Sequence, residues 1–215
     1  MSTPRPWDLI AFDFDGTLAD SFPRFVQVHN QLAARHGFGR IEPDQVQALR
    51  RLPPRELMRR LGVPAWRLPL LMIQGRRLFA ELPGPVALFP QAEAGLRQLH
   101  ARGVALALVT SNSAATCQAA LGPAWELFGH HRCGVSLHGK ARRLRQLARA
   151  HGIAPARLLY VGDMASDAEA AREAGCGFAA VAWGYAPAEA LQALGPQRVL
   201  QLPAQIGTLL DAAAA

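Results

Sequence analysis

Lysine is almost absent from this 215-residue chain, which carries 23 basic residues of which only Lys140 is a lysine. The others are arginines, so a position that needs only a positive charge is usually filled by arginine in this sequence. An ammonium is a compact charge with three donors, whereas a guanidinium is a wide planar fork. Retention of this one lysine therefore predicts a narrow site, and the alternative is an ordinary exposed residue on a helix.

Cysteine is also scarce. Cys117, Cys133 and Cys176 form no C-x-x-C pair and leave an odd number, which argues against a disulfide framework and indicates a reducing, cytoplasmic environment. The stretch GHHRCG at 129–134, with His138 nearby, lacks a second cysteine or histidine pair at ligand spacing. We therefore expect no zinc site there.

Long apolar runs are missing as well. No segment approaches the roughly 18 apolar residues of a membrane span, and Asp13 interrupts the first apolar run too early for a signal peptide. The sequence therefore predicts no membrane partner.

The positive charge first suggests a nucleic-acid partner, because the net charge is +7 and the isoelectric point is near 10.5. The arginine pairs are scattered over separate segments, however, with no aromatic residues between them and no DNA-binding motif. Exposed helix faces explain such pairs better. We expect no nucleic-acid partner.

Short apolar runs alternate with helical segments over most of the chain. The runs are typical of strands buried on both faces of a parallel sheet, and they lie at 9–12, 104–109, 157–161, 177–183 and 198–202. The helical segments each end near a glycine, and they lie at 91–101, 141–151 and 167–174. This alternation predicts an α/β fold with a doubly wound, Rossmann-like parallel sheet.

Residues 19–87 break the alternation because they contain no strand-like run. Prolines separate their amphipathic stretches, which lie at 22–36, 44–51, 54–61 and 65–81. The pattern predicts an all-helical domain inserted after the first strand. The core is then formed by residues 1–18 and 88–215.

Polar residues stand where the predicted strands end. Asp13, Thr110 and Asp163 follow three of the apolar runs, and Lys140 begins a helix between the last two. Because ligands bind at the carboxyl ends of strands in open α/β sheets, we expect these side chains to share one site. The most specific segment is DFDGT at 13–17, where two carboxylates spaced by one residue lead into a Gly-Thr turn.

Four segments together resemble the motifs of the haloacid dehalogenase superfamily, and within it the phosphoglycolate-phosphatase-like hydrolases with a helical cap. DFDGT is similar to motif one, LVTSN at 108–112 to motif two, Lys140 to motif three and GDMASD at 162–167 to motif four. They occur in family order over nearly the whole chain. The resemblance implies a Mg²⁺-dependent phosphatase that hydrolyses a small phosphorylated metabolite through an aspartyl-phosphate, and residues 19–87 would be its cap.

The resemblance also implies catalytic roles for four residues. Asp13 would attack phosphorus, and Asp15 would act as general acid and then as general base. Thr110 would offer its hydroxyl to a phosphoryl oxygen. Lys140 would offset negative charge between Asp13 and the phosphoryl group as the transition state forms.

Ligand contacts follow from the same resemblance. The phosphate would be bound by Asp13, Phe14, Asp15, Thr110, Ser111 and Lys140. Oxygen ligands for Mg²⁺ would come from Asp13, Asp163 and the backbone carbonyl of Asp15. Asp167 would support the metal site without direct coordination.

Other readings stay open at this point. A sugar phosphomutase of the same superfamily would use the same pair of aspartates. A regulatory phospho-acceptor protein, such as a signalling receiver domain, also pairs an aspartate with a lysine, although receivers are shorter and lack a helical insertion.

The identity of the substrate ester remains open among phosphoglycolate, a sugar phosphate and a nucleotide monophosphate. The oligomeric state is open as well. Arg50, Arg51 and Arg55 are candidates for binding a second anionic group, against the alternative of an exposed basic face.

Overall fold

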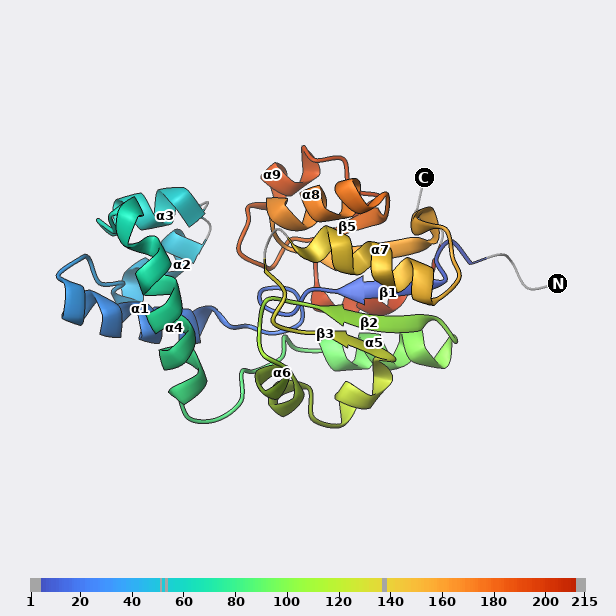
Figure 1. The fold of residues 1–215 in the computed structure, drawn as a ribbon, viewed down its shortest axis with the longest axis horizontal. Helices are drawn as coiled ribbons and strands as arrows, with labels where there is room; N and C mark the ends of the chain where they lie inside the picture. Colours follow the sequence, from blue (N-terminus) through green and yellow to red (C-terminus); the bar gives the residue numbers. More distant parts are fainter. Residues whose placement is uncertain (1–4, 51, 53, 137–138, 212–215) are drawn as a thin grey trace.

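The centre of the molecule is a parallel sheet of six strands (Figure 1). The computed structural model describes residues 5–211 except 51, 53, 137 and 138. Its strands are β1 (Leu9–Phe12), β2 (Ala105–Val109), β3 (His130–Arg132), β4 (Leu158–Gly162), β5 (Gly177–Val181) and β6 (Arg198–Leu200). Their order across the sheet is β3-β2-β1-β4-β5-β6, and every pair is parallel. This is the order of a doubly wound sheet, so the predicted fold class is confirmed.

Helices cover both faces of the sheet, which explains why the strands are apolar along their whole length. One face is covered by α7 (Lys140–Ala150), α8 (Ala165–Ala174) and α9 (Ala188–Gln192), and the other by α5 (Ala92–Ala101) and α6 (Ala114–Leu121) (Figure 1). Successive strand residues point to opposite faces. Thus Ile10 and Phe12 belong to one hydrophobic cluster, while Leu9 and Ala11 belong to the other.

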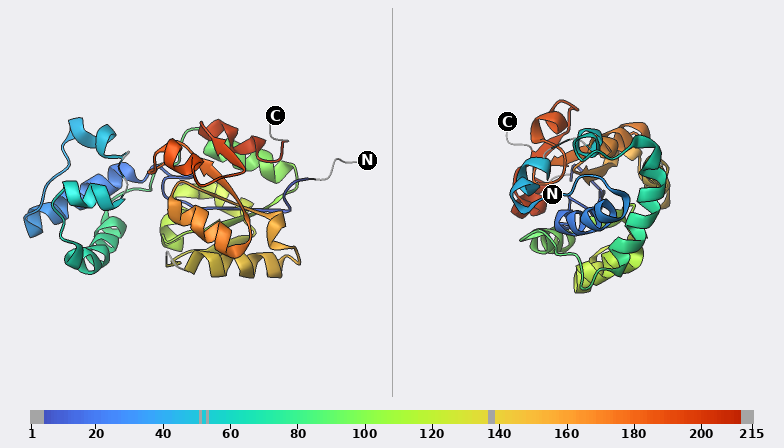
Figure 2. Two further views of the ribbon diagram at one scale, coloured as in Figure 1. Left: turned by 90° about the horizontal axis from the view of Figure 1, so that it is seen from above. Right: turned by 90° about the vertical axis from the view of Figure 1, so that its left-hand side faces the viewer.

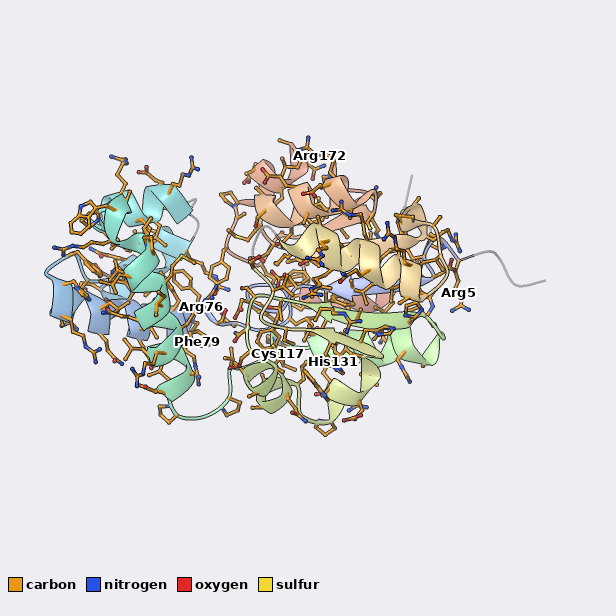
Figure 3. The ribbon with its side chains drawn as sticks, viewed as in Figure 1. Arg5, Arg76, Phe79, Cys117, His131 and Arg172 are labelled. Carbon is orange, nitrogen blue, oxygen red and sulfur yellow. The ribbon has the colours of Figure 1, made fainter. Side chains whose placement is uncertain are left out.

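Four further helices lie beyond the carboxyl ends of the strands and pack around a hydrophobic cluster of their own (Figure 2). They are α1 (Phe22–His36), α2 (Val46–Arg50), α3 (Pro54–Arg60) and α4 (Leu68–Glu81). Leu32, Leu61 and Leu78 are buried in this cluster. Phe79 on α4 packs against both this cluster and the α5 face of the sheet (Figure 3).

The two connections between the sheet and these four helices run side by side. Asp20 N–H donates to the Ala87 carbonyl at 2.8 Å. Ala19 forms isolated bridges to Asp15 and to Leu88. The predicted domain boundaries at residues 18/19 and 87/88 fall where these two connections lie side by side. The division into two domains stays a prediction.

The histidine-rich stretch and the lengths of the helices bear on the predictions about zinc and membranes. His130 and His131 of the GHHRCG stretch form part of the edge strand β3, and His138 lies outside the described residues. Among the helices that the structure describes, none is both long and apolar enough to cross a membrane.

Candidate active site

The polar residues that follow β1, β2 and β4 meet at one edge of the sheet. Strand β1 lies between the other two, with Phe12 in register with Leu108 and Val161. Asp13 N–H donates to the Val161 carbonyl at 2.9 Å, which holds the end of β1 against β4. Asp13, Thr110 and Asp163 are buried here. The predicted convergence of these three side chains is therefore observed.

Gly16 shapes the turn that follows Asp13. Its φ of +75° lies in the left-handed region, and a Cβ at this position would overlap the Asp163 carboxylate and the Tyr185 ring. Thr17 Oγ1 donates to Asp163 Oδ1 at 3.2 Å, and Tyr185 N–H donates to Asp163 Oδ2 at 2.8 Å. The Gly-Thr pair of DFDGT is thus required to bring the first motif against the fourth.

Lys140 lies between two carboxylates in the interior. Its Nζ donates to Asp13 Oδ2 at 2.8 Å and to Asp167 Oδ1 at 2.7 Å, and the residue is 2% exposed. Burial alone would lower the pKa of Lys140, but the Asp13 carboxylate, with further contributions from Tyr160 and Asp167, raises it well above its usual value. The alternative of an exposed helix residue is wrong for this position.

Three carboxylates form a group that fits a hard divalent cation. Asp13, Asp163 and Asp167 each place one oxygen within 4.8 Å of the others, and all three are buried. Lys140 pairs with two of them, and among the described residues no cation pairs with Asp163. Burial, followed by the charges of Asp167 and Asp13, raises the pKa of Asp163 well above its usual value. Oxygen ligands with an excess of negative charge are what Mg²⁺ binds in proteins.

Asp167 accepts hydrogen bonds at both of its oxygens and shares Lys140 with Asp13. Oδ1 accepts from Lys140 and from the Tyr160 hydroxyl at 3.3 Å, and Oδ2 accepts from Met164 N–H at 3.1 Å. Burial, followed by the charge of Asp13, raises the pKa of Asp167 to about 6. This environment fits a residue that orients Lys140, and its predicted place outside direct metal coordination stays a prediction.

Asp15 points away from this group toward motif two. Both of its carboxylate oxygens accept from Asn112 Nδ2, at 3.2 and 3.1 Å. Burial, followed by the charge of Asp13, raises the pKa of Asp15 to about 6. A carboxyl group that titrates near neutrality suits general acid–base catalysis.

The geometry agrees with the comparison of the chain with known proteins. The model of one family, described as haloacid dehalogenase-like hydrolase, matches residues 10–181. The chain belongs to this family. The predicted superfamily and the prediction that the protein is an enzyme are both confirmed.

Relatives of this haloacid dehalogenase-like hydrolase share nearly its whole length. A phosphoglycolate phosphatase from Synechococcus elongatus is 34% identical over 199 residues, which cover 92% of this chain and 94% of the relative. The phosphoglycolate phosphatase of Vibrio cholerae is 31% identical and covers 94% of this chain and 95% of its own. A haloacid dehalogenase-like hydrolase from Streptococcus pneumoniae has the same fold, with a TM-score of 0.75, 20% identity and coverage of 94% and 97%.

A cavity of about 270 Å³ lies in this hydrolase between the site and helices α1, α2 and α3. It is lined by Asp13, Asp15, Phe22, Phe25, Arg50, Leu52, Leu57, Met58, Ser111, Lys140, Met164, Ser166 and Tyr185. Of the three arginines considered for a second anionic group, Arg50 lines the cavity and Arg55 is exposed outside its lining. Arg51 lies outside the described residues.

The remaining residues predicted to contact the phosphate are Phe14, Thr110 and Ser111. Phe14 N–H donates to Asp13 Oδ1 at 2.8 Å. Thr110 Oγ1 accepts from Asn112 N–H at 3.1 Å, which leaves its own proton free to donate. Ser111 lines the cavity. The role of each as a phosphate contact stays a prediction.

Several residues that shape the site were not predicted from the sequence. Asn112 lies in the segment that resembles motif two, but no role was predicted for it. Its place just after a predicted strand, at the end where Asp15 also lies, was a signal that could have identified it. Thr17 was likewise part of DFDGT. Tyr160 and Tyr185 carried no signal, because an aromatic residue within or after an apolar strand is normally a core residue.

Proposed function

We propose that this protein is a Mg²⁺-dependent phosphatase that hydrolyses a small phosphate monoester through an aspartyl-phosphate on Asp13. The observation that carries the proposal is the position of the only lysine, which bridges Asp13 and Asp167 inside a buried acidic group. The phosphoglycolate phosphatases among the relatives support the reaction class and make phosphoglycolate one of the first esters to test.

Asp13 and Asp15 both act in each of the two steps of the reaction, Asp13 as nucleophile and then leaving group, and Asp15 as acid and then base. An oxygen of Asp13 forms a bond to phosphorus while the bond from phosphorus to the alcohol oxygen breaks, and Asp15 gives its proton to that oxygen. Asp15 then removes a proton from a water molecule that attacks phosphorus, and the bond to Asp13 breaks to release phosphate. Asn112 supports both steps because it holds the Asp15 carboxyl in one orientation.

Lys140 and Thr110 stabilise the charge that develops on the phosphoryl oxygens. Lys140 is fixed by Asp13 and Asp167, so its ammonium needs little reorganisation when negative charge grows beside it. The narrow, buried position also explains why arginine does not occupy it, since a planar fork needs more room. Thr110 and Ser111 add hydroxyl donors from the end of β2.

Asp13 and Asp163 would hold the metal ion, with the Asp15 backbone carbonyl as a further ligand and Asp167 in support. When bound, Mg²⁺ offsets the repulsion between the Asp13 carboxylate and the phosphate and polarises the phosphoryl group. Residues 19–87 form the cap in this proposal, and the protein acts in the cytoplasm on a phosphorylated metabolite.

The proposal is tested by release of inorganic phosphate from p-nitrophenyl phosphate with Mg²⁺ and with excess EDTA. Asp13→Asn is nearly isosteric, so we expect it to abolish turnover while the circular dichroism spectrum stays unchanged. Asp44→Asn, at an exposed position of the inserted helices, is the matched control. Substantial turnover by Asp13→Asn, or full activity in EDTA, would contradict the proposal. Steady phosphate release from a sugar phosphate separates a phosphatase from a phosphomutase.

A further inference from the structure

We infer that the alcohol part of the substrate is uncharged and largely apolar, because the described residues of the inserted segment that line the cavity are apolar apart from Arg50, which is already paired with Asp20. The inference rests on the proposed phosphatase function and narrows its substrate class. It differs from what the name of the relatives suggests, since the glycolate of phosphoglycolate carries a carboxylate.

The described walls of the cavity have a charged end on the side of the sheet, which also carries Ser111, Met164, Ser166 and Tyr185, and an apolar end on the side of the inserted helices. Asp13, Asp15 and Lys140 at the charged end serve the phosphoryl group. The inserted helices and the segment between them contribute Phe22, Phe25, Leu52, Leu57 and Met58 at the other end. A carboxylate placed among these side chains would lose its hydration without gaining a partner, which is costly. An apolar group would gain from burial there.

Arg50 is the exception at the apolar end, and its charge is already in use. Its Nη2 lies 3.0 Å from Asp20 Oδ1 and donates to the Trp183 carbonyl at 3.3 Å. The guanidinium carbon also lies 5.5 Å from the centre of the Phe22 ring and 5.7 Å from that of Phe89. These contacts join α2 to the connection between β1 and α1, which contains Asp20, and to the loop after β5, which contains Trp183. Arg50 therefore holds the inserted helices against the sheet.

A substrate carboxylate would compete with Asp20 for the charge of Arg50. The Asp20 Oδ1 atom is buried and accepts no hydrogen bond within the described part of the chain, so the Arg50 guanidinium 3.0 Å away is what offsets its charge. Drawing the guanidinium away would leave this charge less well compensated, which costs free energy. The pair therefore opposes a substrate with a second negative charge.

The size of the cavity sets a limit on the same group. Its volume of about 270 Å³ is just below the usual range of small-molecule sites, roughly 300–1,000 Å³. A phosphoryl group together with a short branched or single-ring alcohol fits this limit.

Two esters of nearly equal shape test the inference. Isobutyl phosphate and phosphoglycolate differ mainly in the exchange of two methyl groups for two carboxylate oxygens. We expect kcat/KM of the wild-type protein with Mg²⁺ to be at least tenfold higher for isobutyl phosphate. Equal values, or a higher value for phosphoglycolate, would overturn the inference and leave the proposed phosphatase intact. Failure to hydrolyse these esters and p-nitrophenyl phosphate would instead overturn the proposed function.

Two variants test the physical cause. Asp20→Asn frees the charge of Arg50, so the preference for isobutyl phosphate over phosphoglycolate should fall about tenfold. Met58→Lys adds a cation to the apolar wall and should shift the preference in the same direction. Met72→Lys, the same change at a half-exposed position of α4 outside the cavity lining, should leave the preference unchanged. An unchanged preference in Asp20→Asn and in folded Met58→Lys would overturn the assignment.

Discussion

Lys140 is the residue on which the proposed mechanism depends most directly. A substitution by arginine keeps the charge but must fit a planar fork between Asp13 and Asp167. We expect Lys140→Arg to lower kcat by about 10²–10³, the usual cost of losing one transition-state contact, and Lys140→Ala to lower it at least as much. Steady-state kinetics with p-nitrophenyl phosphate measure the effect.

A second variant on the same helix controls for surface changes. Arg142 is exposed two residues further along α7, and Arg142→Lys should leave kcat unchanged because surface substitutions rarely matter. Wild-type kcat in Lys140→Arg would remove this lysine from the catalytic machinery.

Asp163 allows the metal to be tested without activity. Mg²⁺ at about 100 times its Kd would stabilise the folded protein by about 2.7 kcal/mol, which corresponds to a rise in Tm of roughly 5–10 °C for a chain of this size. In Asp163→Asn the amide can keep the contacts to Thr17 and Tyr185, while the repulsion from the other carboxylates is relieved. We expect a higher Tm than wild type without metal and no further rise with Mg²⁺. A full Mg²⁺-dependent rise in this variant would show that Asp163 is not a ligand.

At the scale of elements, α1 carries a pH-dependent contact within the inserted helices. His29 on α1 is buried, and its Nε2 lies 2.7 Å from the Gly39 carbonyl. Burial lowers the pKa of His29, and the bond to Gly39 opposes this shift only in part. The unfolded chain, with a pKa of about 6.5, therefore binds the proton more readily than the folded protein.

The stability that neutral His29 contributes is present above about pH 6.5 and is lost as the pH falls below that value. We expect His29→Gln, which keeps a donor for Gly39, to reduce the loss of Tm between pH 7.5 and pH 5.5. Thermal melts of the two proteins at matched ionic strength measure the difference. Parallel decreases in Tm would show that His29 does not titrate in this range.

Elements with strong hydrophobic patterns were predictable from the sequence, and elements without them were not. Strand β1 and helix α1 agree with their predicted bounds, because a continuous apolar run and a clear amphipathic stretch define them. Strand β3 was missed because its three residues are His, His and Arg at the edge of the sheet. Helix α6 was missed because its alanines give little contrast between its two sides.

The same limit applies to the site. Strand ends pointed to Asp13, Thr110 and Asp163, since topology alone brings the carboxyl ends of neighbouring parallel strands together. The contacts of Asn112 and Tyr185 depend on how loops fold back over the sheet, which no local pattern encodes. The pairing of Arg50 with Asp20 likewise joins two segments that are distant in the sequence.

At the scale of the whole molecule, we expect the inserted helices to be removable as a unit. Asp20 and Ala87 lie side by side, so a short glycine–serine linker can replace residues 21–86. Both hydrophobic clusters that pack on the sheet consist mainly of residues outside 21–86, so their packing would be kept. We expect the shortened protein to fold, to hydrolyse p-nitrophenyl phosphate more slowly, and to lose its preference between isobutyl phosphate and phosphoglycolate.

Circular dichroism and kcat/KM for the two esters measure these outcomes. A shortened protein that folds and keeps the full preference would show that selectivity lies in the sheet domain and not in residues 19–87.

The buried position of Lys140 also determines how the protein responds to amine chemistry. The chain has one lysine, and that lysine is 2% exposed and held between two carboxylates. Its ammonium keeps its proton at ordinary pH, so it is a poor nucleophile toward activated esters and aldehydes. Such reagents should leave Lys140 unmodified in the folded protein. Unfolding would expose this amine, so labelling at Lys140, located by peptide mass spectrometry, reports directly on whether the site is intact.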